Sequence, residues 1–192
     1  MIRMMRLMVG VLLLQFICGC THYYTTIKQT GQAADLKQYK EINVGWLDLS
    51  EDRYKDYGYD ESNKGIWKQL VYDQNLKNMP LYLKDFIPGK TIHTAKAKRV
   101  PPAARGLMVK FTNARYIQHT NSAAQIFIGP MAGSDTLDVT VHFIDGRSGK
   151  ELNSSTISIK SEAGQGWGSM GFEGRVNNTV YNLAYYIMEQ TQ

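Results

Sequence analysis

Apolar and polar residues alternate most regularly in the last third of the chain. Between residues 135 and 145 every second residue is apolar, namely Leu137, Val139, Val141 and Phe143. Successive side chains of a strand point to opposite faces, so this pattern predicts a strand with one buried face. The segment 145–150 (DGRSGK) has the composition of a turn, and residues 152–161 resume a strand pattern. Together they predict a β-hairpin.

The remaining periodic segments predict further strands and two helices. Shorter strands are expected at 42–49, 91–97 and 106–118, with Asn113-Ala114 marking a bulge in the last. A helix is expected from Ser62 to about Met79, where Pro80 limits it, and 81–87 could add another turn. A final helix is expected from about Phe172 to Gln190. Its apolar face is formed by Val176, Val180, Leu183, Ala184, Ile187 and Met188.

This order of elements predicts an α/β two-layer sandwich. Its sheet would be mixed and largely antiparallel, with the helices packed on one face. Residues 21–39 are polar and show little periodicity, so they are interpreted as a flexible tether. The predicted organisation is a signal peptide at 1–19, a lipidated tether at 20–40 and a single α/β domain at 41–192.

The first residues have the features of an export signal. Arg3 and Arg6 precede an apolar run at 7–17. A run of about 11 residues suits the hydrophobic region of a signal peptide and is too short for a membrane-spanning helix, which needs about 20. The segment is therefore expected to direct export.

The apolar run ends in Ile17-Cys18-Gly19-Cys20, which resembles the bacterial lipobox. Cys18 is an unusual residue in the second lipobox position, and an ordinary secretory signal with two cysteines is the alternative. The resemblance implies a bacterial envelope lipoprotein that is cleaved before Cys20. That cysteine would carry a diacylglyceryl thioether and an amide-linked acyl chain such as palmitate, which anchor stably together. Thr21 in place of Asp implies the outer membrane, on its periplasmic side.

A strand with alternating apolar residues runs into a turn with the pattern D-x-x-S-G-K, and the residues of this segment are Leu137, Val139, Val141, Asp145, Ser148, Gly149 and Lys150. Over about the last 90 residues, the chain resembles a class of small envelope lipoproteins of unknown function, in which a D-x-x-[ST]-G-K/E hairpin precedes a terminal helix. This similarity implies a fold and no catalytic residues.

Composition restricts the possible functions. The 192-residue chain has a formal charge of +5 and two cysteines. Loss of residues 1–19 would remove Arg3, Arg6 and Cys18, and lipid would block Cys20, so stability must come from the hydrophobic core. The small charge argues against a nucleic-acid partner. The basic residues cluster in one segment, at Lys96, Lys98, Arg99 and Arg105. We interpret this cluster as a solvated loop or as a site of contact with anionic lipid.

Two apolar segments are candidate contact sites. The sequence 166–171 (GWGSMG) matches G-x-G-x-x-G, but no second strand can follow it, so nucleotide binding is not expected. It is interpreted as a turn into the last helix or as a contact loop that uses Trp167, Met170 and Phe172. The run Ile126, Phe127 and Ile128 belongs either to the core or to a surface patch for a partner.

No catalytic set is recognisable. The four histidines lack metal-ligand spacing, and no serine lies in a nucleophile elbow. Acidic residues close to three tyrosines leave glycan chemistry open: Glu41, Asp48, Glu51, Asp52 and Asp56, with Tyr54, Tyr57 and Tyr59. The leading hypothesis is a non-enzymatic accessory or binding lipoprotein without metal or cofactor, whose partner is another envelope protein. The alternatives are a peripheral envelope enzyme or binding module for glycan or lipid, and a carrier with an apolar cavity.

Overall fold

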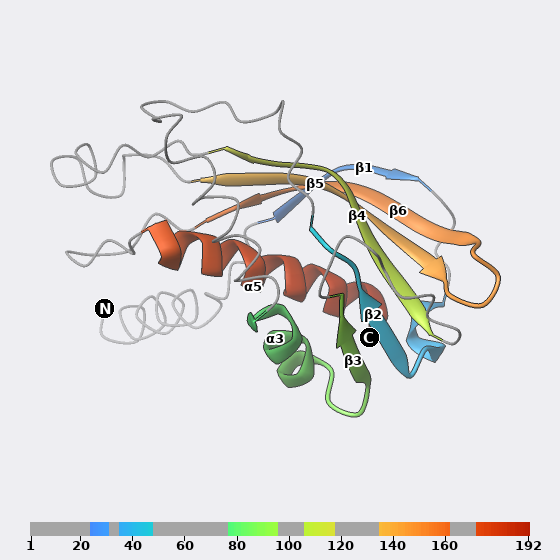
Figure 1. Cartoon of the computed structure of the whole chain (residues 1–192). Coiled ribbons are helices and arrows are strands. Elements are labelled where there is room, and N and C mark those ends of the chain that lie inside the picture. The colour runs from blue at the N-terminus through green and yellow to red at the C-terminus, as the bar shows by residue number, and fades with distance from the viewer. Residues whose placement is uncertain (1–23, 31–34, 48–76, 96–105, 118–134, 162–171) are drawn as a thin grey trace, which may run out of the picture.

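The computed structural model describes residues 24–30, 35–47, 77–95, 106–117, 135–161 and 172–192. Six strands in this part of the chain form one sheet of order β1-β6-β5-β4-β2-β3 (Figure 1). The elements are β1 (Tyr24–Thr30), η1 (Leu36–Gln38), β2 (Glu41–Val44), α3 (Met79–Phe86), β3 (Thr91–Thr94), β4 (Leu107–Ile117), β5 (Thr136–Asp145), β6 (Glu151–Lys160) and α5 (Phe172–Thr191). Strand β2 runs parallel to β3 and β4, and the other pairs are antiparallel. The sheet is therefore mixed, as expected for an α/β fold.

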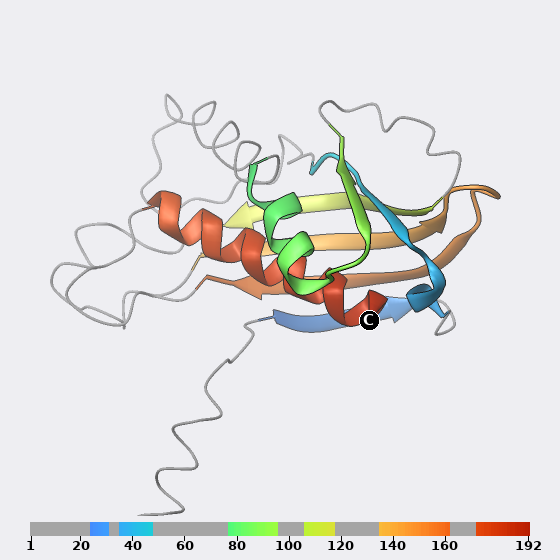
Figure 2. The ribbon, with the colours of Figure 1, turned by 90° about the horizontal axis from the view of Figure 1, so that it is seen from below.

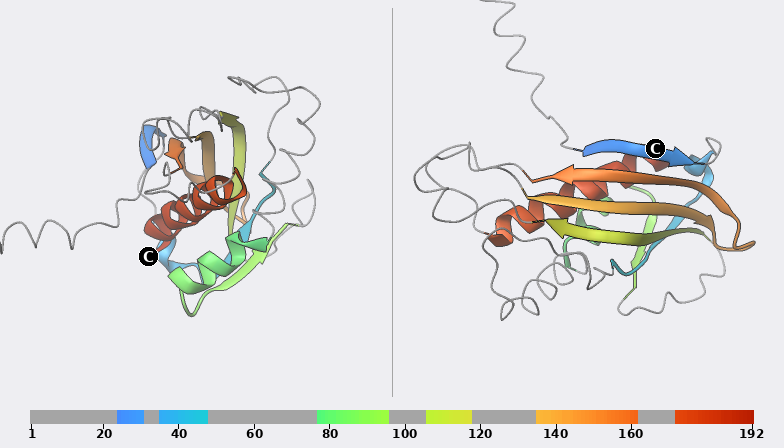
Figure 3. Two further views of the ribbon diagram at one scale, coloured as in Figure 1. Left: turned by 90° about the vertical axis from the view of Figure 1, so that its left-hand side faces the viewer. Right: turned by 90° about the horizontal axis from the view of Figure 1, so that it is seen from above.

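The long helix α5 lies against the sheet. Strands β1, β6, β5 and β4 lie above it in Figure 1, whereas β2 and β3 bend down beside it. Figure 2 shows α3 and α5 in front of β1, β6, β5 and β4 when the molecule is viewed from below. The view from above in Figure 3 shows the same four strands in front of α5. Helix α3 packs against α5 and β3.

The core forms where the apolar faces of β4, β5 and β6 meet that of α5. Val139, Val141 and Phe143 on β5 are almost completely buried, and the polar residues between them are partly exposed. The predicted apolar face of α5 is also buried, which confirms both the hairpin and the final helix. Burial of each large aliphatic or aromatic side chain contributes about 1.5–3 kcal/mol, so these elements supply much of the stability.

The bulge predicted in the long central strand is present. The register between β4 and β5 shifts between Thr112 and Arg115, and Asn113 has a φ of 52°. Asn adopts this left-handed conformation more readily than most residues. The extra residue lets Ala114 and Tyr116 remain in the core.

Helix α3 corrects the role assigned to Pro80. We expected Pro80 to limit a helix that begins at Ser62, but it occupies the first turn of α3. Proline is tolerated there because the first N–H groups of a helix have no acceptor within the helix. The expected helix before Met79 falls mostly within 48–76, outside the described residues.

The predicted tether is wrong for the residues described there. Residues 24–30 form β1, which pairs with β6 in antiparallel fashion, and Leu36 of η1 is buried. Strand β1 lies at the sheet edge, and six of its seven residues are exposed. Exposure on both faces removes the apolar alternation that identifies a strand, so this sequence looks like a linker. In the described residues, no helix is both long and apolar enough to span a membrane.

Candidate functional site

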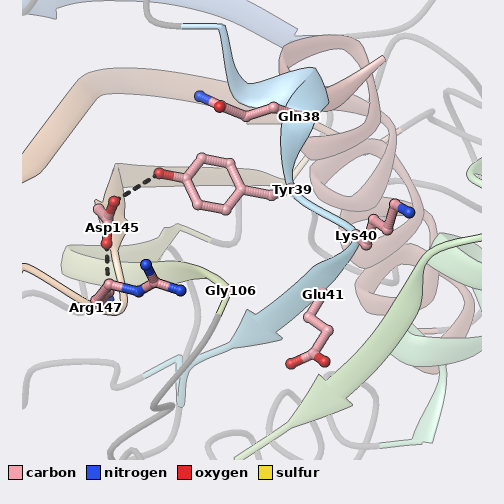
Figure 4. A pocket seen from close by; sticks show the side chains of 7 residues that line it. All are labelled: Gln38, Tyr39, Lys40, Glu41, Gly106, Asp145 and Arg147. Carbon is pink, nitrogen blue, oxygen red and sulfur yellow. Dashed lines mark hydrogen bonds between the residues drawn. The ribbon is translucent and has the colours of Figure 1, made fainter.

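A pocket of about 330 Å³ opens beside the turn between β5 and β6. Three segments that are distant in sequence form it: the connection from η1 into β2, the residue before β4, and the turn itself. Figure 4 shows the lining residues Gln38, Tyr39, Lys40, Glu41, Gly106, Asp145 and Arg147. The sheet brings these segments together, because β2 and β5 are the two neighbours of β4.

Asp145 connects the two sides of this pocket. Its Oδ1 atom accepts the backbone N–H groups of Arg147 at 2.7 Å and Ser148 at 3.0 Å. Its Oδ2 atom accepts the Tyr39 hydroxyl at 3.0 Å (Figure 4). The backbone N–H of Ser148, followed by the Tyr39 hydroxyl, lowers the pKa of Asp145. Burial, followed by the same hydrogen bond, raises the pKa of Tyr39.

The turn explains the pattern D-x-x-S-G-K. Asp145 is needed because its carboxylate satisfies backbone donors inside the turn. Gly149 has a φ of 69°, which favours glycine, and its N–H donates to the carbonyl of Asp145 at 2.8 Å. The N–H of Asp145 donates in turn to the carbonyl of Lys150 at 2.9 Å. The motif therefore encodes turn geometry.

Gly106 lets two backbone segments approach closely next to the pocket. Its φ is 138°, and a Cβ atom there would lie 2.9 Å from the carbonyl oxygen of Glu41 and 3.0 Å from Nδ2 of Asn43. Its own carbonyl accepts the N–H of Gly146 at 2.9 Å. Only glycine tolerates both this φ and this close approach, so the contact of the segment before β4 with β2 depends on it.

The charged side chains of the pocket determine what it could bind. Arg147, Lys40 and Glu41 are exposed, and none of the three has an ion-pair partner within the described residues. In Figure 4 the Arg147 guanidinium and the Tyr39 ring border the same space, whereas Lys40 points away. A guanidinium can bind a carboxylate or phosphate through two parallel hydrogen bonds. Arg147 could therefore bind an anionic group, in a pocket that the carboxylates of Glu41 and Asp145 also line.

A second polar cluster lies at the opposite end of the strands and is buried. Asp135 Oδ2 lies 2.7 Å from Arg175 Nε on α5 and accepts the Tyr116 hydroxyl at 2.9 Å. The backbone N–H of Asp135 donates to the Ser161 hydroxyl at 3.0 Å. Burial, followed by the Asp135 charge, raises the pKa of Tyr116. Because the two charged side chains are at most 3% exposed, this cluster has a structural role.

The histidines do not form a metal site in the part that the structure describes. His142 faces outward from β5, as predicted, with Nδ1 2.7 Å from Glu151 Oε2 and Nε2 2.7 Å from Thr112 Oγ1. The hydrogen bond between His142 and Glu151 lowers the pKa of Glu151. His93 is exposed on β3, and the described residues contain no group of three or more potential ligands that could hold a metal ion.

Most residues selected from the sequence lie outside the described residues. These are Cys20, Ile126, Phe127, Ile128, Trp167, Met170 and the acidic residues from Asp48 to Asp56. Phe172 is the first residue of α5, but its side chain is not described. Glu41 is described and lines the pocket. Sequence reasoning missed Gln38, Tyr39 and Lys40 because they fell within the predicted tether; Leu36, an apolar residue shortly before Ile42, was the available signal.

Comparison with known proteins gives only distant structural similarity. No family model and no curated protein matches the chain. A PelC dodecamer from Paraburkholderia phytofirmans is 14% identical with a TM-score of 0.46, covering 88% of this chain and 99% of that one. An uncharacterised protein is 10% identical with a TM-score of 0.37, covering 78% and 90% respectively. A PDZ domain protein from Parabacteroides distasonis ATCC 8503 is 9% identical with a TM-score of 0.32, covering 87% and 35%. Similarity at this level establishes no shared function.

Proposed function

We propose that this chain is a lipid-anchored, non-enzymatic accessory or binding lipoprotein of the bacterial envelope. It is held in the outer membrane on the periplasmic side, and its partner is another envelope protein. The observation that carries the proposal is the lipobox Ile17-Cys18-Gly19-Cys20 directly after a short apolar run. Several acyl chains on one residue give stable attachment.

The pocket supports binding over catalysis. A general base works best when its pKa lies near the working pH, but hydrogen bonds hold the pKa of Asp145 below the ordinary range. Three hydrogen-bond donors already occupy this carboxylate, namely the N–H groups of Arg147 and Ser148 and the Tyr39 hydroxyl. Arg147 remains available, so we assign it to a carboxylate group on the partner.

We also propose a finer description of the fold and two contact surfaces. The fold is a two-layer sandwich, supported by the position of α3 and α5 on the same side of the sheet strands (Figure 2). Two apolar groups remain proposed contact surfaces for the partner: Ile126, Phe127 and Ile128, and Trp167, Met170 and Phe172.

A glycan-binding module is the second candidate. The Tyr39 ring beside the Arg147 guanidinium favours it, since an aromatic ring can stack on a sugar while the guanidinium holds an acidic substituent. Glycan-array binding that disappears in Arg147→Ala would favour this candidate over a protein partner.

Lipidation and partner binding can be tested separately. Growth with an alkyne analogue of palmitate should label the wild-type protein, and Cys20→Ser should abolish the label. Crosslinking in native membranes should capture an envelope protein, and Arg147→Ala should lose it. Lys84→Ala, which changes an exposed cation on α3, is the matched control. An unlabelled wild-type protein would refute the lipid anchor, and equal capture by both variants would refute the role of Arg147.

A further inference from the structure

The folded body begins very close to the proposed lipid anchor. Only three residues lie between Cys20 and Tyr24, and the four Cα–Cα steps that join them span at most about 14 Å. Tyr24 belongs to the body, because it pairs with Ile159 on β6 and its ring lies 5.3 Å from that of Tyr186. A lipid on Cys20 therefore holds the beginning of β1 near the bilayer.

The edge of the sheet beside the anchor is exposed and carries an apolar side chain. Among the described strands β1 pairs only with β6, and its register shifts between Thr26 and Lys28. Ile27, at this irregularity, is 62% exposed. In the described residues only Leu81 on α3 is a comparably exposed large hydrophobic residue.

The chemistry of this edge suits a lipid surface better than another strand. An apolar side chain can enter the boundary between headgroups and acyl chains, while a neighbouring lysine contacts lipid phosphates. The register shift at Ile27 and the charge of Lys28 both oppose pairing with a further strand, because bulges and edge lysines protect sheets against strand addition.

We propose that the β1 edge, with Ile27 and Lys28 at its centre, is the surface on which the body rests against the phospholipid bilayer. The inference rests on the proposed lipidation of Cys20. It also fixes which parts of the molecule face away from the membrane. Strand β3, at the opposite edge, is five strand spacings or about 24 Å away across the sheet.

The strand registers separate the pocket from the anchor. Tyr24 is level with Leu137 through their shared partner Ile159, and Asp145 lies eight residues further along β5. Eight residues of extended chain span about 26 Å. The pocket is therefore distant from the anchor along the strands, a direction parallel to the bilayer in this orientation, and β5 lies two strand spacings or about 10 Å from the β1 edge.

Fluorescence quenching in vesicles can test this orientation. The full lipoprotein is reconstituted into vesicles of phosphatidylethanolamine and phosphatidylglycerol that contain a lipid with a nitroxide close to its headgroup. Processing removes Cys18 and lipid blocks Cys20, so a label attaches only at an introduced cysteine. An environment-sensitive fluorophore is placed at Ile27→Cys, or at Thr91→Cys on the opposite edge as the matched control. Both positions are exposed, and circular dichroism checks that each variant is folded.

Strong quenching at Ile27→Cys, several-fold greater than at Thr91→Cys, is expected. Equal quenching at the two positions, or no quenching at either, would overturn the proposed orientation. Intact-mass measurement on the same sample separates this failure from failure of the anchor, since an unacylated N-terminus refutes lipidation itself. Adding Lys28→Glu to the Ile27→Cys variant should reduce its quenching, whereas adding Lys84→Glu should not. Equal effects of the two charge reversals would overturn the assignment of this edge.

Discussion

Replacing Asp135 with Asn tests whether the buried ion pair secures one end of the sheet against α5. The Asp135 side chain is fully buried, and its Oδ2 atom lies 2.7 Å from Arg175 Nε and 2.9 Å from the Tyr116 hydroxyl. Asn has nearly the same size and shape as Asp, so the substitution removes charge without leaving a cavity. The buried guanidinium would then face a neutral amide.

The expected loss of stability follows from the burial of both charges. Removing one partner of a buried ion pair costs about 3–5 kcal/mol, because the remaining charge stays out of water without its counterion. In a chain of this length each kcal/mol lowers the melting temperature by about 2–4 °C, so a decrease of roughly 6–20 °C is expected. Replacing both partners with apolar residues, as in Asp135→Leu with Arg175→Met, should recover much of this loss.

Thermal unfolding of the detergent-solubilised protein, followed by far-ultraviolet circular dichroism, measures the change. The control is Asp138→Asn, three residues further along the chain, where the side chain is partly exposed on the opposite face of the sheet. Its effect should remain within about 0.5 kcal/mol. A melting temperature for Asp135→Asn equal to that of the control would refute the structural role assigned to this ion pair.

Three further predictions concern the pocket and its turn. Gly106→Ala should cost more free energy of unfolding than Gly149→Ala in urea titrations, because a Cβ atom meets backbone at 2.9 Å at Gly106 and open space at Gly149. The conformational cost at Gly149 alone is about 1–2 kcal/mol, and a larger loss there would contradict this account. Asp145 should contribute its full stabilisation at pH values above the ordinary pKa of a carboxyl group, and this contribution should fall as the pH drops through the lowered folded-state pKa. The variant Asp145→Asn should lack this pH dependence. Tyr39→Phe should raise the pKa of Asp145 in an NMR titration of the carboxyl carbon, and an unchanged pKa would show that the hydroxyl does not stabilise the carboxylate.

Local patterns in the sequence were sufficient to predict the central strands, the hairpin and the final helix. The alternation from Leu137 to Phe143 and the helical spacing from Val176 to Met188 are each properties of one segment. Their buried faces follow directly from that spacing, because a strand repeats every two residues and a helix every 3.6. The turn at Asp145 and the bulge at Asn113 were predictable for the same reason, since each depends on the conformational preferences of neighbouring residues.

The tertiary structure decided what depends on residues distant in sequence. Tyr39 and Asp145 are 106 positions apart, and they meet only because the η1–β2 connection and the β5–β6 turn lie at the same end of the sheet. The partnership of Asp135 with Arg175 on α5 likewise has no local signal. Strand β1 was invisible in the sequence because an edge strand exposed on both faces has no apolar alternation, and only its hydrogen bonds to β6 distinguish it from a linker.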